Sequence, residues 1–169
     1  MSQSHSQTEP WMRGPIEGVH PLVAPVFYCF EQVREDLAKY TGGLSREQVW
    51  HTFGRASVGF HIRHLGGSVE RLSAYLAGRQ LSEAQLEALK REWDADEDLS
   101  AILQKMNAQF AACEEQLRTL DPATLYDKRA VGRRALPTTV IGLIVHICEH
   151  TQRHLGQAIT LAKLLHSGQ

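Results

Sequence analysis

Residues 136–165 read LPTTVIGLIVHICEHTQRHLGQAITLAKLL, and their periodicity is the strongest structural signal in the chain. Apolar residues recur in alternating steps of three and four, which is the period of one face of an α-helix. Pro137 suits the first turn of such a helix, where a backbone N–H has no partner to lose. The sequence therefore predicts a long last helix that reaches about residue 165. Its heptad-spaced positions, which should face other helices, are Val140, Leu143, Ile147, His150, His154, Gln157, Leu161 and Leu164.

Three further stretches of the chain show the same helical period. They cover residues 19–40, 58–76 and 99–120, and a glycine or a proline follows each stretch within two residues. Such residues end helices, because glycine takes the left-handed cap without strain and proline disfavours the helical conformation of the residue before it. The regular part of the first helix should begin near Pro25. Four long helices with heptad-like stripes predict an all-α protein, a four-helix bundle.

The segments between these helices predict short additional elements. Ser45 and Ser82 are each followed three residues later by a glutamine, which is the capping-box pattern at the start of a helix. Residues 1–15 are polar and contain two prolines, so we expect a flexible N-terminal arm and a single bundle domain over residues 16–169. Residues 123–136 read as an irregular polar connection. No stretch alternates with a period of two between turn residues, so we expect no sheet.

The composition excludes several classes of partner. The chain has 169 residues, is 43% hydrophobic, and carries 18 Lys and Arg against 19 Asp and Glu. A net charge of −1 gives no reason to expect binding to nucleic acid or to an anionic membrane. The most apolar stretch, residues 140–148, is far shorter than the roughly 20 residues that a membrane span requires.

The cysteines and the N-terminal residues indicate the cellular compartment in which the protein is expected. Cys29, Cys113 and Cys148 are far apart and form no CxxC pair, so neither a disulfide framework nor a cysteine zinc site is expected. The first fifteen residues show no basic head followed by an apolar run, as a secretory signal would. We therefore expect a cytoplasmic protein.

Two histidines of the last helix suggest a metal site. His150 and His154 lie one helical turn apart, with about 5–6 Å between their Cβ atoms, which suits two ligands of one ion. The alternative is a pair of core histidines with ordinary hydrogen-bond partners, and two successive histidines on a buried face favour the metal. His61 or His64 of the second long helix could add a third ligand; periodicity leans towards His61 and leaves both open. We expect His146 to flank the site.

The other histidines lie in terminal or connecting segments and should be exposed: His5, His20, His51 and His166. A site of three neutral imidazoles would bind a divalent ion such as Zn²⁺ or Ni²⁺. It would leave coordination positions open, and the ion would lower the pKa of a bound water or thiol. The sequence shows no evident fourth ligand.

Two stretches resemble the DinB / YfiT-like superfamily of bacterial metal-binding four-helix bundles. They are SVGFHIRHLGGSVERLSAYLAG at 57–78 and the last helix, with its core EHTQRHLGQ at 149–157, and the likeness covers roughly residues 16–166. In that family a histidine before an apolar-small pair joins two histidines of the last helix on a metal. The resemblance thus implies His64, which precedes Leu65-Gly66, together with His150 and His154 as metal ligands. Glycines at both 66 and 67 depart mildly from the pattern and could let another helix approach closely.

The resemblance also implies a homodimer and, for some members, metal-dependent transferase or isomerase chemistry with a low-molecular-weight thiol as cofactor. The first hypothesis is therefore a divalent-metal protein with thiol (S-)transferase activity. The second is a non-enzymatic, stress-related protein in which the metal is structural and joins the second and last long helices. Catalytic and thiol-binding residues stay unassigned: Arg133 and Arg134 could hold a carboxylate, but solvated loop charges are the favoured interpretation.

Overall fold

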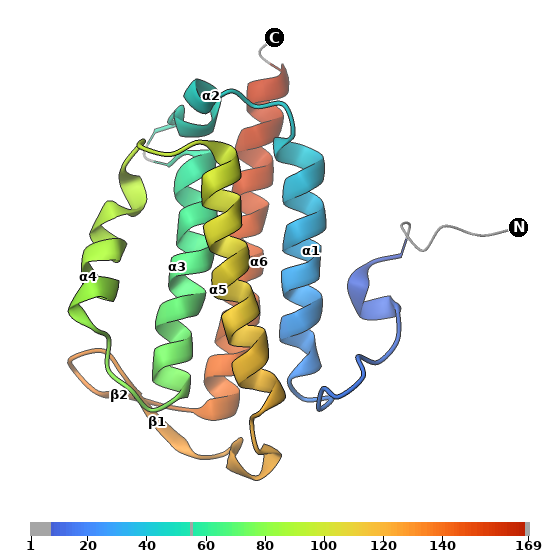
Figure 1. The fold of residues 1–169 in the computed structure, drawn as a ribbon, viewed down its shortest axis with the longest axis vertical. Coiled ribbons are helices and arrows are strands. Elements are labelled where there is room, and N and C mark those ends of the chain that lie inside the picture. Colours follow the sequence, from blue (N-terminus) through green and yellow to red (C-terminus); the bar gives the residue numbers. More distant parts are fainter. Residues whose placement is uncertain (1–7, 55, 168–169) are drawn as a thin grey trace, which may run out of the picture.

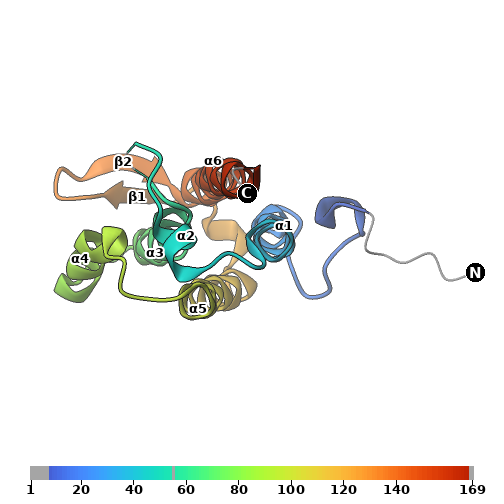
Figure 2. The same ribbon diagram turned by 90° about the horizontal axis from the view of Figure 1, so that it is seen from above.

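Four long helices form the body of the molecule (Figure 1). The structure is a computed structural model that describes residues 8–54 and 56–167. The long helices are α1 (Ala24–Thr41), α3 (Val58–Leu76), α5 (Leu99–Arg118) and α6 (Val140–Ser167). Seen from above, α3 lies between α5 and α6, and α1 closes the bundle beside α6 (Figure 2). The prediction of an all-α four-helix bundle is confirmed.

Short helices join the long ones and set their directions. α1 and α6 run one way along the bundle, and α3 and α5 run the other way (Figure 1). Because α3 and α5 are parallel, the chain must return along the outside of the bundle between them. It does so through α4 (Glu83–Lys90) and the 3₁₀ turn η3 (Arg91–Trp93). The remaining short helical elements are α2 (Arg46–Trp50), η2 (Pro10–Met12) and η4 (Pro122–Thr124).

Local capping chemistry fixes where several helices begin. Ser45 and Ser82 both form the expected capping boxes, each accepting a hydrogen bond from the backbone N–H three residues later. Ser57 caps α3 by accepting from the N–H of Phe60 at 3.1 Å. α1 starts at Ala24 with a proline in its first turn, as predicted. These starts depend only on neighbouring residues, which is why the sequence reveals them.

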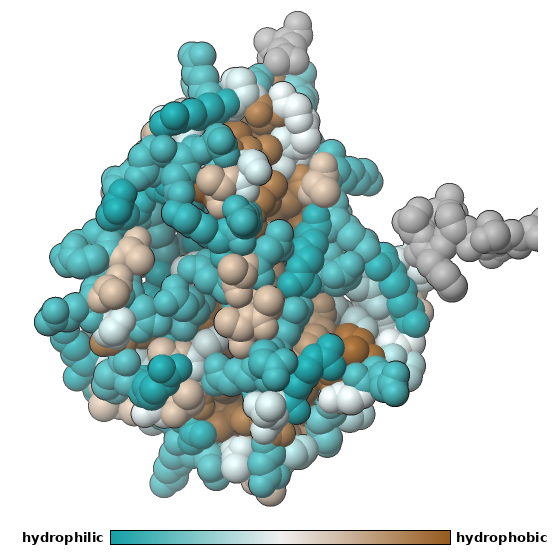
Figure 3. Space-filling model, in the orientation of Figure 1, coloured by the Kyte–Doolittle hydropathy of each residue, from teal (hydrophilic) through white to brown (hydrophobic). Residues whose placement is uncertain are grey.

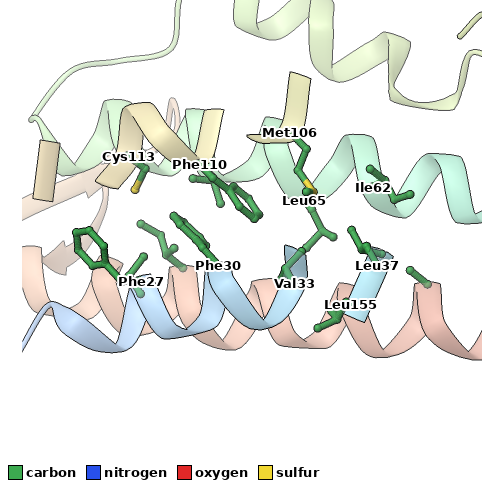
Figure 4. Packing of buried hydrophobic residues seen from close by; sticks show 14 of the residues in the cluster. Phe27, Phe30, Val33, Leu37, Ile62, Leu65, Met106, Phe110, Cys113 and Leu155 are labelled. Atoms are coloured by element: carbon green, nitrogen blue, oxygen red, sulfur yellow. The ribbon is translucent and has the colours of Figure 1, made fainter. Parts of the chain in front are cut away.

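The core is a continuous apolar cluster shared by the four long helices (Figure 4). Phe30 of α1 stacks on Phe110 of α5 with ring centroids 4.0 Å apart and an interplanar angle of 11°. Such a pair contributes about 0.5–1.5 kcal/mol beyond the burial of its area. Leu65 of α3 and Met106 of α5 are also fully buried in this cluster. The stack ties α1 to α5 on the side of the bundle away from α6.

The expectation of no sheet is wrong, because a small hairpin precedes α6. Strands β1 (Lys128–Val131) and β2 (Leu136–Thr139) pair antiparallel, with Lys128 opposite Thr139. Each strand has only four residues, too few for a two-residue alternation to stand out in the sequence. The turn between them has positive φ at Gly132 (+69°) and at Ala135 (+49°). Glycine was the one local turn signal, and alone it did not identify a hairpin.

The same hairpin corrects the predicted start of the last helix. Pro137 lies in β2 and not in the first turn of α6, which begins at Val140. The hydroxyl of Thr139 accepts a hydrogen bond from the N–H of Gly142 at 3.1 Å and so caps the helix. A two-stranded ribbon tolerates proline, because each strand has a free edge where no N–H is required.

The predicted buried face of α6 is right in its first half and wrong in its second. A straight helix has about 3.6 residues per turn, so a seven-residue stripe drifts by about 20° per heptad. Over the 28 residues of α6 this drift turns Gln157 and Leu164 out to solvent. His150 and His154 consequently lie half-buried at the edge of the core. The observed buried positions are Val140, Leu143, Ile144, Ile147, Thr151, Leu155, Ala158 and Ala162.

The described part of the predicted N-terminal arm is in contact with α1. Pro10 is buried, and Arg13 Nη2 donates to Glu35 Oε2 at 2.8 Å. Tyr28 donates its hydroxyl proton to the carbonyl of Gly14 at 2.8 Å. Residues 1–7, which include His5, lie outside the described residues. The flexibility expected for this arm stays a prediction.

The surface of the molecule on the side of α4 and α5 is polar. Figure 3 shows this face mostly hydrophilic, with apolar side chains visible mainly in patches between polar ones. Within residues 8–54 and 56–167, no helix combines the length and the apolarity that a bilayer crossing needs. Arg133 and Arg134 are exposed in the hairpin turn, which agrees with the interpretation that they are solvated loop charges.

Candidate metal centre

Two histidines of α6 form one side of the candidate site. His150 and His154 lie one turn apart, and their ring centroids are 4.6 Å from each other. Both side chains are half-buried, because the drift of the helical face leaves them beside the core rather than inside it. A ligand at such an edge can bind an ion and still leave room for a further molecule from solvent.

His64 of α3 completes the group. Its ring centroid lies 5.0 Å from that of His150 and 4.3 Å from that of His154. One ring nitrogen from each of the three residues lies within 4.8 Å of the other two. Because α3 and α6 pack side by side, residues 86 positions apart in sequence meet here. The structure thus brings together the three histidines that the resemblance implied, and this group could hold a divalent metal ion.

One pair of nitrogens in the group has the spacing of two ligands on a tetrahedral ion. His64 Nε2 and His150 Nε2 are 3.4 Å apart. Two nitrogens that are each about 2.0–2.1 Å from a tetrahedral Zn²⁺ lie about 3.3–3.4 Å from one another. In addition, the buried Nδ1 of His150 has no hydrogen-bond partner among the described residues. His150 is therefore not a core histidine held by ordinary polar partners, which was the alternative left open by the sequence.

His61 lies next to this group and is more buried than the three. The residue is 4% exposed, and its Nδ1 is 3.0 Å from Nδ1 of His154. Periodicity placed His61 on the buried face of its helix, and that placement is right. The residue contacts one of the candidate ligands, but it does not share their cluster of nitrogens.

The remaining histidines lie away from the cluster. His146 is exposed, and its Nδ1 is 2.7 Å from Oε1 of Glu149. Its ring centroid lies 5.4 Å from that of His150, so it flanks the group as expected. The other described histidines are exposed, and they are His20, His51 and His166.

Burial keeps the rings of His61, His150 and His154 neutral. Loss of solvation, followed by the repulsion of His64, lowers the pKa of His61 to about 4 and that of His150 to about 4. The same two causes, with further repulsion from His150 and His61, lower the pKa of His154 to about 3. A metal binds the neutral form of imidazole, so these rings are ready to coordinate at neutral pH without first losing a proton.

On the α3 side, the ring of His64 is contacted from the crossover, the segment with α4 and η3 that connects α3 to α5. Glu92 in η3 places its Oε2 2.7 Å from Nδ1 of His64. Phe60 stacks on His64 with centroids 5.5 Å apart, and Trp93 stacks on Phe60 at 3.7 Å. Glu92, which contacts the ring directly, thus comes from a segment 28 residues further along the chain.

Sequence reasoning did not find Glu92 as part of the site. Glu92 stands in a short polar helix with no apolar periodicity, so nothing local marks it as buried. The one available signal was indirect. Gly67 lies one turn before Arg71 on a face that is otherwise packed, and a missing side chain there makes space for a buried charge.

The arrangement is that of an all-helical bundle with three half-buried imidazoles at one edge, a group that could hold a divalent metal ion. The family model of the DinB superfamily matches residues 30–158, which span most of α1 to α6 and include all three histidines. The chain belongs to the DinB superfamily. No curated protein matches the chain.

Proposed function

We propose that the protein binds one divalent metal ion through His64, His150 and His154. The observation that carries this proposal is the convergence of three ring nitrogens within 4.8 Å of one another, from two helices that are distant in sequence. The lowered pKa values of His150 and His154 support it, since both rings are neutral above about pH 4 and 3 respectively. Zn²⁺ and Ni²⁺ are the proposed ions, because both are well suited to imidazole ligands.

The proposed activity is metal-dependent transfer to or from a low-molecular-weight thiol. An ion held by three imidazoles keeps a coordination position open and lowers the pKa of a thiol or water that binds there. Among the described residues, no fourth histidine, cysteine, aspartate or glutamate joins the group. This favours an open site over the alternative, a structural metal in a non-enzymatic, stress-related protein.

Space for a second molecule lies on the α6 side of the cluster. A hollow of about 460 Å³ borders His61 and runs along α6 past Arg153, Gly156, Gln157, Thr160 and Leu161. Arg153 uses one of its terminal nitrogens in an ion pair with Glu149 at 2.5 Å and is half-exposed. Its remaining N–H groups could donate hydrogen bonds to the carboxylate that small biological thiols often carry.

The assembly and location of the protein are part of the same proposal. The family resemblance favours a homodimer, and three free cysteines with no CxxC pair favour the reducing cytoplasm. Sedimentation of the purified protein at micromolar concentration tests the dimer, and a single species with the mass of one chain would contradict it.

Metal analysis of purified protein tests the proposed site directly. We expect about one Zn²⁺ or Ni²⁺ per chain and a raised melting temperature on adding either ion, because a ligand that binds only the folded state stabilises it. His150→Ala should weaken binding more than 100-fold, since even the loss of a ligand's outer partner costs about 10–100-fold. His146→Ala is the matched control on the same helix and should bind normally. Folded protein that takes up neither ion, or equal losses in both variants, would contradict the proposal.

A thiol probe separates the two hypotheses about activity. The Co²⁺-loaded protein should develop a thiolate-to-metal absorption band on adding 2-mercaptoethanol if a coordination position is open. A closed structural site should show no band at any thiol concentration that leaves the metal bound. The second result would favour the structural role.

A further inference from the structure

A buried ion pair lies directly behind His64. The side chain of Glu92 is 5% exposed, and its two carboxylate oxygens have different partners. Oε2 is 2.7 Å from Nδ1 of His64, and Oε1 accepts from Nη1 of Arg71 at 2.7 Å. Arg71 is itself buried, with 10% of its side chain exposed. A buried carboxylate of this kind needs its cationic partner, and the pair leaves one oxygen for the imidazole.

This contact determines which nitrogen of His64 carries the proton. A carboxylate only accepts hydrogen bonds, so Nδ1 of His64 must be the protonated nitrogen. In the neutral ring Nε2 then has a free lone pair, and Nε2 is the atom that faces His150 at 3.4 Å. The contact with Glu92 therefore prepares the nitrogen that belongs to the candidate ligand cluster.

The absence of a side chain at position 67 leaves room for the ion pair of Glu92 and Arg71. A Cβ atom at position 67 would lie 2.6 Å from Oε1 of Glu92 and 2.8 Å from Nη1 of Arg71. Gly67 thus makes the space that the pair occupies. Phe60 covers a face of the His64 ring, so the imidazole is held in its plane by Glu92 and against rotation by stacking.

We infer that Glu92, oriented by Arg71, is a positioning residue that holds His64 in the Nδ1–H tautomer and presents Nε2 to the metal. This inference rests on the proposed metal site, and it adds the crossover between α3 and α5 to that site. The partners of the two other candidate ligands differ: His154 contacts the neutral ring of His61, and Nδ1 of His150 has no partner within residues 8–54 and 56–167. In this described part of the chain, His64 is the one candidate ligand hydrogen-bonded to a charged group, which fixes its proton.

The sharpest test is Glu92→Gln, because Arg71 decides how the new amide turns. The guanidinium attracts the amide oxygen, so the NH₂ group must point at Nδ1 of His64. Nδ1 then has to accept, and the proton of His64 moves to Nε2, where it blocks the metal. We expect the ¹⁵N NMR signals of metal-free protein to show this change of tautomer. Zn²⁺ affinity should fall about 10–100-fold, the usual cost of losing a ligand's outer partner.

A second variant distinguishes positioning from simple structural damage. In Glu92→Gln combined with Arg71→Met, no cation holds the amide oxygen, and that oxygen can accept from Nδ1–H of His64. The double variant should recover the original tautomer and at least part of the lost affinity. A merely structural role predicts the opposite, because removing a second buried partner would do further harm.

Glu70→Gln is the matched control. Glu70, Arg71 and Glu92 line a cavity of about 290 Å³ between α3, α4 and α5. Among the described residues, Glu70 accepts hydrogen bonds only from Gln85 and Gln109. It should change neither the tautomer of His64 nor the Zn²⁺ affinity. The inference is overturned if Glu92→Gln keeps the Nδ1–H tautomer and normal affinity, or if Glu70→Gln weakens Zn²⁺ binding equally. Wild-type protein that binds no metal would instead overturn the proposed function, while the tautomer, read without metal, would still decide the role of Glu92.

Discussion

The two flanks of the histidine cluster are built differently. On the α3 flank, His64 is held by a buried charge, and the neighbouring Gly66 and Gly67 have no room for a side chain. On the α6 flank, the rings of His150 and His154 lie at the edge of the core, and nothing lies within 4 Å of where a Cβ at Gly156 would be. A rigid flank can hold the ligand geometry while the open flank gives access to solvent. The contrast explains how one site can be both ordered and reachable.

Adding a methyl group to each flank tests this contrast most strongly. In Gly66→Ala the new Cβ would lie 2.9 Å from Cα of Met106, a backbone atom of α5 that cannot turn aside. We expect the free energy of unfolding to fall by about 2 kcal/mol. This is the usual cost of overpacking a core, less the stabilisation that alanine gains over glycine in a helix. Urea denaturation measures it.

Gly156→Ala is the control on the open flank. It gains helix propensity without a clash and should stabilise the protein by about 0.5–1 kcal/mol. Equal effects of the two substitutions would show that the flanks do not differ in packing.

Acidification should lower the free energy of unfolding of the metal-free protein, because the rings of His61, His150 and His154 are kept neutral in the folded state. The pKa is about 4 for His61 and His150 and about 3 for His154, against about 6.5 in an unfolded chain. Below pH 6.5 the unfolded state therefore binds protons that the folded state does not, and stability falls as the pH falls towards 4. We expect a loss of about 2 kcal/mol between pH 7 and pH 5, well under the sum of the separate shifts, because water screens half-buried rings.

Urea unfolding at these two pH values measures the effect, and the window lies above the range in which most carboxylates titrate. His154→Gln should reduce the pH dependence, because it removes one of the three groups. A free energy of unfolding that is the same at pH 7 and pH 5 would show that the rings are not held neutral by burial.

The smallest expected effect concerns the outer partner on the α6 flank. His61 contacts His154 as a neutral group, and a neutral hydrogen bond contributes about 0.5–1.5 kcal/mol, roughly half of a charge-assisted one. His61→Gln should therefore weaken Zn²⁺ binding only about two- to fivefold. Isothermal titration beside Glu92→Gln gives the comparison. A larger loss in His61→Gln than in Glu92→Gln would reverse the assignment of the rigid flank.

Local signals predicted the helices well and the site in part. Capping residues such as Ser45 and Ser82 act on their own first turns, so the sequence alone identifies those starts. The pairing of His150 with His154 also follows from one helical turn. The choice between His61 and His64 did not follow from periodicity, because both lie near the face that meets α6 and only their depth differs.

The sequence by itself determined an all-helical bundle, two histidines on one face of its last helix, and a resemblance that pointed to a third. Tertiary structure alone decided that α6 drifts off its heptad stripe, that a hairpin precedes it, and that Glu92 lies behind His64. The physical reason is range. Caps and helical periods act over three to four residues, whereas the pairing of Glu92 with His64 depends on how a separate segment packs against α3.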